Sequence, residues 1–293
     1  MQAQKNILVT GANGQLGNEF RLLSASYPAF NFFFTDVEEL DICDGSAVSA
    51  FVKENNVDYI LNSAAYTAVD RAEEDADTCR RINASAVQNL GLAAASVGAK
   101  VFHVYTYYVY RGVHYNPYNE DDDTAPCSVY GATKLEGERL LLAACPESVV
   151  VRTSWLYSCF GNNFVKTMLR LGREKPELNV IFDQIGSPTY AADLAAAILR
   201  MVEVSETSAF HSGIYNFSNE GVCSWYDFTK AIHRMAGIRD CKVHPIEGSE
   251  YPSKATRPFY SVMNKKKIKN TFGLIIPHWE ESLAVCIEKL MKQ

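Results

Sequence analysis

The sequence has no excess of basic residues. Lys and Arg number 28 against 34 Asp and Glu, which gives a formal net charge of −6 and a pI near 5.6. Nucleic acids and anionic membrane surfaces attract a basic face, so this balance argues against both as partners. In so acidic a chain, we expect the short basic run at 265–269 to be a solvated face.

Long apolar runs and closely spaced cysteine pairs are also missing. No apolar run approaches about 18 residues, so no membrane span is expected. Met1 leads into a strand within five residues, so no signal peptide is expected. The 8 cysteines form no C-x-x-C pair, which favours buried thiols in a reducing compartment over a zinc site or a disulfide framework. We therefore expect a cytoplasmic protein without a metal site.

The order of the apolar runs predicts the fold class. With 293 residues, the chain is long enough for one large domain with a lobe or for two small domains. Short apolar runs alternate with helical segments at 6–10, 31–35, 57–61, 100–105 and 148–153. This alternation predicts an α/β fold, a doubly wound parallel sheet of the Rossmann type. We expect a dinucleotide-binding domain over 1–155 and a smaller C-terminal α/β substrate lobe over 156–293, partly interleaved with the first domain.

Helical character is expected in several later segments. A helix starting near Ser46 follows the second strand, and others are expected over about 83–97, 191–202 and 225–235. Ligands of such sheets bind at the carboxyl ends of the strands. The residues that follow each strand are therefore the first candidates for a site.

A glycine-rich stretch follows the first strand and opens a helix. Gly11, Gly14 and Gly17 have the spacing G-x-x-G-x-x-G, which is not the stricter G-x-G-x-x-G fingerprint. Glycines at such a turn let the backbone approach a pyrophosphate, whose charge is favoured at the helix N-terminus. An ordinary turn is the alternative, but the strand-turn-helix context favours dinucleotide binding.

Three acids follow the second strand. Asp36 lies 19 residues after Gly17, near where an acid meets the adenosine ribose. An acid there disfavours a 2′-phosphate, which favours NADH over NADPH. Asp41 and Asp44 follow, and any of the three could instead cap the helix that starts near Ser46.

Tyr130 and Lys134 are four residues apart, which places both on one face of a helix. A phenol with its ordinary pKa near 10 is a poor acid–base catalyst at neutral pH, and an adjacent ammonium lowers that pKa. Thr106, at the end of the fourth strand, can face the same crevice and position a substrate oxygen. Alone, the Tyr-x-x-x-Lys pattern is more often a solvent-facing pair; the glycine turn, the small residues 62–65 and Thr106 favour catalysis.

The chain resembles the extended short-chain dehydrogenase/reductases and, within them, the dTDP-4-dehydrorhamnose reductase family. The resemblance covers nearly the whole chain. The segments that carry it are Thr10–Gly17, Asn62–Asp70, Pro117–Glu120, Pro126, Tyr130–Lys134, Arg152–Tyr157, Gly161–Met168, Asp183–Thr189 and Arg257–Pro258.

The resemblance implies reduction of the C4 keto group of dTDP-4-dehydro-L-rhamnose by NADPH or NADH, giving dTDP-L-rhamnose for cell-surface polysaccharide. Tyr130 would protonate the C4 alkoxide, Lys134 would lower the pKa of Tyr130 and bind the nicotinamide ribose, and Thr106 would contact the sugar. Gly14, Gln15 and Leu16 would hold the pyrophosphate, Asp41 and Ile42 would lie near the adenine, and Ala65, Tyr66 and Thr67 would lie along the cofactor. Together with Gly11, Gly17, Asp36 and Ala64, these residues make up the expected cofactor site.

On the substrate side, the resemblance implies contacts from Trp155 to the nucleotide-sugar and from Arg257 to its diphosphate, which suits a guanidinium fork. The resemblance also leaves open a Mg²⁺ ion at a subunit contact, as in some relatives, and either a monomer or a homodimer.

One segment departs from the family pattern. The family motif Ser-Thr-Asp-Tyr-Val-Phe-Asp-Gly is replaced by Tyr-Thr-Tyr-Tyr-Val-Tyr-Arg-Gly over 105–112. Tyr107 stands where the family has an acid that contacts the sugar. Two alternatives to the reductase therefore stay open: a catalytically weak, cofactor-binding regulatory subunit, and a nucleotide-sugar epimerase or dehydratase. A dehydratase needs an acid–base carboxylate pair near Thr106, which Tyr105 and Tyr107 do not supply.

Overall fold

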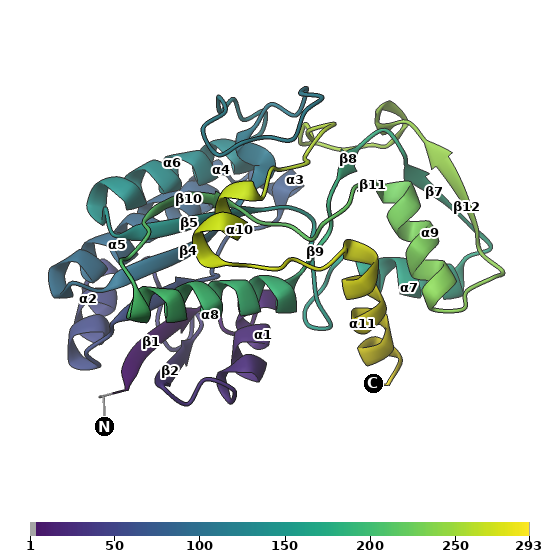
Figure 1. Cartoon of the computed structure of the whole chain (residues 1–293). Coiled ribbons are helices and arrows are strands. Elements are labelled where there is room, and N and C mark those ends of the chain that lie inside the picture. The colour runs from purple at the N-terminus through teal and green to yellow at the C-terminus, as the bar shows by residue number, and fades with distance from the viewer. Residues whose placement is uncertain (1–3, 293) are drawn as a thin grey trace.

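The computed structural model describes residues 4–292 and is built on a parallel sheet of six strands (Figure 1). The strands are β1 (Lys5–Thr10), β2 (Phe30–Thr35), β3 (Tyr59–Asn62), β4 (Lys100–Thr106), β5 (Ser148–Thr153) and β10 (Gly213–Asn216). They lie in the order β10-β5-β4-β3-β1-β2, so the order reverses around β1 and places the topological switch point at its carboxyl end. The expected fold class is confirmed. Residues 1–3 and 293 lie outside the described residues. They are the outer ends of the two expected domains. The expectation that there is no signal peptide also depends on residues 1–3.

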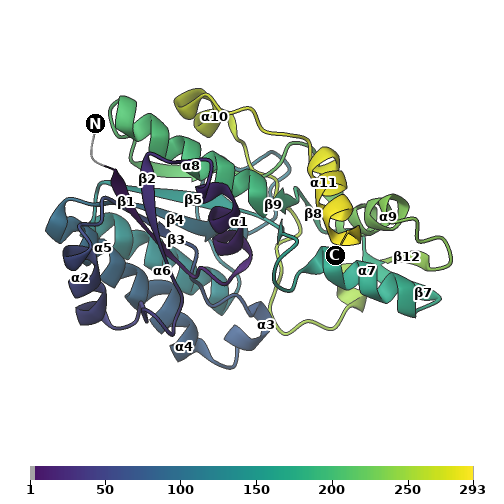
Figure 2. The same cartoon turned by 90° about the horizontal axis from the view of Figure 1, so that it is seen from below.

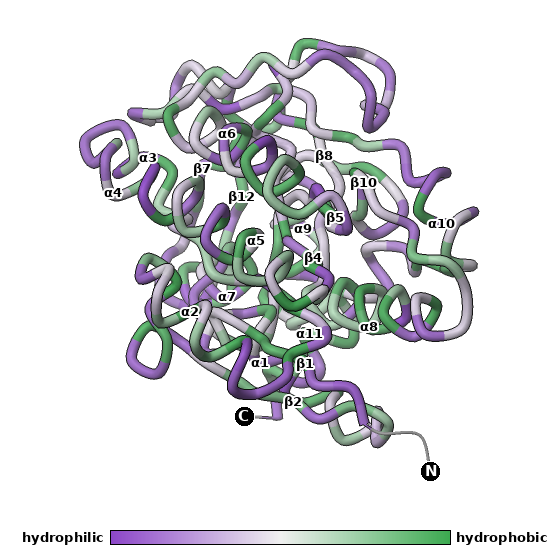
Figure 3. The backbone as a smooth tube through the Cα atoms, turned by 90° about the vertical axis from the view of Figure 1, so that its left-hand side faces the viewer, coloured by the Kyte–Doolittle hydropathy of each residue, from purple (hydrophilic) through white to green (hydrophobic). Residues whose placement is uncertain are grey.

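Helices cover both faces of the sheet (Figure 2). One face packs on α2 (Gly45–Glu54), α5 (Ala86–Val97) and α6 (Val129–Ala144), and the other on α1 (Gln15–Ser24) and α8 (Ala191–Thr207). Successive residues of a strand point to opposite faces, so Leu8 of β1 joins the first core while Ile7 and Val9 join the second. Burial on both faces explains why these strands are continuous apolar runs. The apolar colouring of α8 is visible in Figure 3.

The helix expected over 83–97 begins differently. A π-helical turn, Arg81–Ser85, joins α4 (Ala76–Arg80) to α5. Here the backbone presses against α6: a Cβ added to Gly137 would lie 2.0 Å from the carbonyl oxygen of Asn83. A one-residue bulge of this kind leaves the apolar periodicity almost unchanged, so the sequence does not reveal it.

A smaller lobe stands beside the sheet, on the right in Figure 1. Its helices are α7 (Phe164–Glu174), α9 (Trp225–Met235) and α11 (Trp279–Met291), and its longest strands, β7 (Glu177–Ile181) and β12 (Lys242–Ile246), pair in parallel. Two short pairs complete it: β6 (Leu156–Tyr157) with β9 (Thr189–Tyr190), and β8 (Ile185–Gly186) with β11 (Cys223–Ser224). Among residues 4–292, no helix has both the length and the apolar composition that crossing a bilayer requires.

Parts of the chain after residue 156 return to the first unit. α8 packs on α1, β10 extends the sheet beside β5, and α10 (Lys266–Phe272) packs against β10. The sequence did not predict β10, because a run of four residues that starts with Gly213 and ends with Asn216 is too short to stand out. The exact domain boundary stays a prediction.

Candidate active site

Both members of the expected catalytic pair lie on α6. The helix is capped by Ser128, whose hydroxyl accepts a hydrogen bond of 3.1 Å from the N–H of Gly131. Tyr130 and Lys134, one turn apart, are 8% and 2% exposed. Both line the same cavity at the edge of the sheet. Burial of both groups makes a solvent-facing pair the wrong interpretation.

A glycine brings this helix close to the end of β4. A Cβ on Gly131 would lie 2.4 Å from the carbonyl oxygen of Tyr108, in the 3₁₀ turn Tyr107–Val109 that follows β4. This close approach places Tyr130 near Thr106, and both side chains line the same cavity. Thr106 is held in turn, because its oxygen accepts a 3.2 Å hydrogen bond from the N–H of Tyr108.

Burial dominates the titration of Tyr130. It raises the pKa of the phenol above its ordinary value of 10, and the nearby hydroxyl of Thr106 offsets only part of that rise. The ring of Tyr108 covers one side of the phenol, edge to face, with ring centroids 5.3 Å apart. At neutral pH Tyr130 is therefore a protonated phenol, the state that a proton donor needs.

Lys134 is the buried cation of the site. Burial lowers the pKa of its ammonium to about 7, against smaller raising effects of Cys79 and Glu138. The Nζ atom donates to the carbonyl oxygen of Val104 at 3.3 Å. Lys134 is not among the groups that set the pKa of Tyr130 in this structure. That Lys134 lowers this pKa stays a prediction. It applies to the step in which the phenol of Tyr130 gives up its proton.

The glycine turn has the backbone expected of a phosphate cradle. Gly11 has φ +66°, and a Cβ there would lie 2.6 Å from the backbone nitrogen of Ala64. A Cβ on Gly17 would lie 2.4 Å from the carbonyl oxygen of Gly11, so this glycine lets α1 pack on the turn. The free N–H groups at the start of α1 face the turn and suit a pyrophosphate.

Two adjoining cavities form one crevice along the carboxyl ends of the strands. The first, of about 640 Å³, is lined by these expected residues: Gly14, Gln15, Leu16, Ala65, Thr67, Thr106, Tyr107, Tyr130, Lys134, Trp155 and Arg257. The second, of about 490 Å³, is lined by Gly11, Gly14, Asp36, Asp41, Ile42, Ala64 and Ala65. Of the expected site residues only Gly17 and Tyr66 line neither cavity. Tyr66 is instead held at both its backbone N–H and its C=O by the side chain of Asn83.

The three acids after β2 have different roles. Asp44 caps α2, accepting 3.0 Å hydrogen bonds from the N–H groups of Ser46 and Ala47. Asp36 ties the end of β2 to the glycine turn, because its carboxylate accepts a 2.9 Å hydrogen bond from the N–H of Asn13. Asp36 and Asp41 line the second cavity, so only Asp44 is explained by capping α2.

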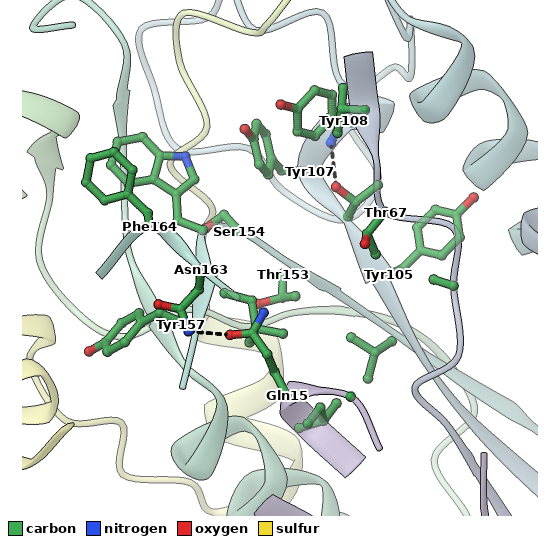
Figure 4. A pocket seen from close by; sticks show the side chains of 18 of the residues that line it. Gln15, Thr67, Tyr105, Tyr107, Tyr108, Thr153, Ser154, Tyr157, Asn163 and Phe164 are labelled. Atoms are coloured by element: carbon green, nitrogen blue, oxygen red, sulfur yellow. Dashed lines mark hydrogen bonds between the residues drawn. The ribbon is translucent and has the colours of Figure 1, made fainter. Parts of the chain in front are cut away.

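Aromatic side chains from the lobe form the far wall of the crevice. Trp155, held at a positive φ of +48°, stacks on Trp225 with ring centroids 3.6 Å apart. Gly186 leaves room for this indole, since a Cβ there would lie 2.6 Å from its Cε2 atom. In Figure 4, Tyr107 and Tyr108 lie at one end of the pocket, and Gln15 and Asn163 lie at the other. The wall is thus built by residues from both units.

Arg257 crosses from the lobe to the nucleotide-binding unit. Its guanidinium forms an ion pair with Asp70 in α3 (Val69–Ala72) and donates a 3.3 Å hydrogen bond to the hydroxyl of Tyr108. Asp70 also accepts a 3.1 Å hydrogen bond from the N–H of Ala255. The arginine is therefore held at the crevice, with its charge partly balanced by Asp70.

Several residues of the site were missed by the sequence analysis. The side-chain amide of Asn163 donates a 3.1 Å hydrogen bond to Gln15, which links the lobe to the glycine turn (Figure 4). Its position within Gly161–Met168 was a usable signal, because this segment is part of the family resemblance. Asp70 likewise ends the resemblance segment Asn62–Asp70, whereas nothing local marks Trp225, which reaches the crevice only through folding.

A metal site finds no support. Within residues 4–292 no group of three or more His, Cys, Asp or Glu side chains is arranged to hold an ion.

Comparison with known proteins gives one consistent family. The family described as "RmlD substrate binding domain" matches residues 5–292. A dTDP-4-dehydrorhamnose reductase from Sinorhizobium fredii (strain NBRC 101917 / NGR234) is 40% identical over 281 residues, which cover 94% of each chain.

Solved structures agree with that relationship. A dTDP-4-dehydrorhamnose reductase from Clostridium acetobutylicum is 43% identical, with a TM-score of 0.93 over 98% of this chain and 99% of its own. A dTDP-4-dehydrorhamnose reductase from Bacillus anthracis, solved in complex with NADP, is 38% identical, with a TM-score of 0.92 and the same coverage. The residues of the crevice, the family match and these relatives lead to the same conclusion. The chain belongs to the dTDP-4-dehydrorhamnose reductase family, and it is an oxidoreductase with a Rossmann-like fold of the kind that binds nicotinamide cofactors.

Proposed function

We propose that this chain reduces the C4 keto group of dTDP-4-dehydro-L-rhamnose to give dTDP-L-rhamnose. When bound, NADPH or NADH supplies the hydride. The backbone of Gly11, Gly14 and Gln15 would hold the pyrophosphate, and the cavity beside Asp36 and Ile42 would take the adenosine. The fit is supported by Gly14, which lines both cavities, and by Gly11, whose missing side chain lets the turn pack against the backbone of Ser63 and Ala64.

In the proposed step, Tyr130 gives its phenolic proton to the C4 oxygen as that oxygen gains negative charge. The raised pKa of Tyr130 keeps the proton in place until then. Lys134 would favour the phenolate that remains, because an adjacent cation stabilises the charged form. The observation that carries this proposal is that Thr106, Tyr130 and Lys134 line one cavity, in which Tyr130 and Lys134 are buried. The same threonine would hold the substrate oxygen next to the donor.

The remaining contacts would hold the nucleotide-sugar. Arg257 would bind the diphosphate through its planar fork of donors, with Asp70 fixing the orientation of the guanidinium. Trp155 would contact the nucleotide-sugar from the aromatic wall. Tyr107 lies in the same cavity, in place of an acidic residue, and would reduce the number of hydrogen bonds to the sugar.

The test is a turnover assay with the purified chain. Oxidation of NADPH or NADH is followed by absorbance after adding dTDP-4-dehydro-L-rhamnose, and the sugar product is identified by chromatography. We expect one dTDP-L-rhamnose per cofactor oxidised. Tight cofactor binding without turnover would contradict the proposal and favour the regulatory subunit. A sugar product formed without net cofactor oxidation would instead indicate an epimerase or dehydratase, whose cofactor is recycled.

The cellular setting is part of the proposal. We place the reaction in the cytoplasm, carried out by a monomer or a homodimer that needs neither a membrane nor a nucleic acid. The acidic balance, a net charge of −6, supports the absence of polyanionic partners. Light scattering of the purified chain, with and without cofactor, measures the oligomeric state.

A further inference from the structure

The buried ammonium of Lys134 has few polar contacts in the protein. Its one described hydrogen bond is the 3.3 Å contact to the carbonyl of Val104. The nearby carboxylate of Glu138 is already engaged by Arg152, whose Nε and Nη2 atoms donate to its two oxygens at 3.0 and 2.6 Å. An ammonium has three N–H donors, so the hydrogen bond to Val104 leaves two donors that need other partners.

An aromatic ring occupies that side. The Nζ atom of Lys134 lies 4.8 Å from the centroid of the Tyr105 ring, within the range of a cation–π contact. Tyr105 is 3% exposed, and its ring also packs against that of His103, with ring centroids 5.5 Å apart. Tyr105 is also one of the residues at which this chain departs from the family motif, where a serine is usual.

We propose that the ring of Tyr105 is the positioning residue for Lys134, supplying the π face on which the buried ammonium rests. This rests on the proposed role of Lys134 in holding the cofactor ribose and stabilising the phenolate. The ring and the Val104 carbonyl fix the ammonium from the side of the sheet, and the remaining donor faces the crevice. The face of an aromatic ring is most effective as a cation partner where water is excluded, as it is here.

The ring, and not the hydroxyl, carries this role. Within residues 4–292 the Tyr105 hydroxyl has no hydrogen-bond partner of ordinary geometry. Removing the hydroxyl therefore leaves the ring in place and removes only a buried polar atom. Replacing the ring by an aliphatic side chain removes the partner of the ammonium.

No other ionisable group beside Lys134 replaces the ring. Burial lowers the pKa of His103 well below its usual value and raises that of Cys79, so both are neutral near pH 7. The ionisable groups that face Lys134 come from three elements: Cys79 of α4, His103 and Tyr105 of β4, and Tyr130 and Glu138 of α6.

The test compares Tyr105→Phe with Tyr105→Leu over a pH series. In the proposed role the ammonium form of Lys134 holds the cofactor ribose, so the affinity for NADPH should fall as the pH rises through the pKa of Lys134, about 7. For Tyr105→Leu we expect this loss about one pH unit lower, the shift that a desolvated cation–π contact corresponds to. For Tyr105→Phe we expect the wild-type midpoint. The readouts are the dissociation constant of NADPH, from fluorescence without sugar, and then the pH profile of kcat/KM.

Tyr215 supplies a matched control. Tyr215 lies in β10, away from the crevice, and is also 3% exposed. The Nζ atom of Lys267 lies 4.7 Å from the centroid of its ring. Tyr215→Leu removes an equally buried tyrosine and a cation–π contact to an exposed lysine, so it tests general destabilisation. We expect the pH midpoint of NADPH binding to stay at the wild-type value in this control.

A graded series covers the case in which Tyr105→Leu does not fold. Phenylalanines with an increasing number of ring fluorines at position 105 weaken the attraction of the ring face for a cation at nearly constant side-chain volume. The pH midpoint of NADPH binding should therefore fall with each added fluorine. The proposal is overturned if the fluorinated series has a constant midpoint, or if Phe and Leu at 105 shift it equally. Because binding is measured without sugar, these outcomes are independent of whether the chain proves to be the reductase.

Discussion

Gly131→Ala provides the sharpest test of how the site is assembled. The glycine follows Tyr130 directly, and its missing side chain lets α6 touch the turn after β4. A Cβ at 131 would lie 2.4 Å from the Tyr108 carbonyl oxygen and 3.0 Å from the Cβ of Pro126. Backbone atoms do not give way as side chains do. Restoring ordinary contact, at 3.4 Å or more, needs a displacement of about 1 Å between helix and turn.

The effect on stability should be small. Overpacking costs about 1–3 kcal/mol. Alanine in a helix is better than glycine by about 1 kcal/mol, which offsets part of that cost. The net loss of about 0–2 kcal/mol corresponds to a fall of a few degrees in Tm for a chain of this length.

The effect on catalysis should be large. A shift of about 1 Å moves Tyr130 away from Thr106, and misplacement of that size costs about 100-fold in rate. We therefore expect kcat to fall about 100-fold, or about 2.7 kcal/mol in the activation free energy. The assay is steady-state oxidation of NADPH with saturating dTDP-4-dehydro-L-rhamnose, with thermal melting measured on the same samples.

Gly91→Ala is the control. It makes the same change inside α5, but the atoms nearest to a Cβ there, at 3.1 Å, belong to the side chains of Ala144 and Leu141. The Leu141 side chain can rotate, and the contact with the Ala144 Cβ needs a shift of only a few tenths of an ångström; none of the three residues lines either cavity. Our reasoning is refuted if folded Gly131→Ala keeps kcat within threefold of wild type, or if Gly91→Ala loses as much.

Three further predictions concern individual side chains. Tyr130→Phe removes the proton donor, so kcat should fall by about 10²–10⁴-fold while the dissociation constant of NADPH, measured by fluorescence, changes little; a loss below tenfold would contradict the assignment. Tyr107→Asp introduces a charged acceptor into the cavity, so kcat/KM for the sugar should rise about tenfold or more; an unchanged value would show that position 107 does not contact the sugar. Asp36→Ser removes a carboxylate from the cavity proposed to take the adenosine, so the ratio of kcat/KM for NADPH to kcat/KM for NADH should rise. A constant ratio would show that Asp36 does not contact the 2′-position of the adenosine ribose.

The parts of the fold that the sequence predicted are local in origin. Strands buried on both faces must be apolar throughout, so β1, β4 and β5 were visible as short runs. The turn after β1 was equally visible, because its close backbone contacts allow only glycine at Gly11 and Gly17. The helix face shared by Tyr130 and Lys134 follows from their spacing alone. These features depend on neighbours in the chain, which the sequence contains.

Tertiary structure decided what surrounds those residues. Trp225 meets Trp155, and Asp70 meets Arg257, across separations that no local pattern encodes. Burial, which is a property of the packed molecule, raises the pKa of Tyr130 where the sequence led us to expect a lowered one. The sequence by itself determined the fold class, and it predicted the glycine turn after β1 and the helix face shared by Tyr130 and Lys134. Only the folded chain decided the solvation and the partners of that pair, because desolvation and long-range contacts arise when distant segments pack together.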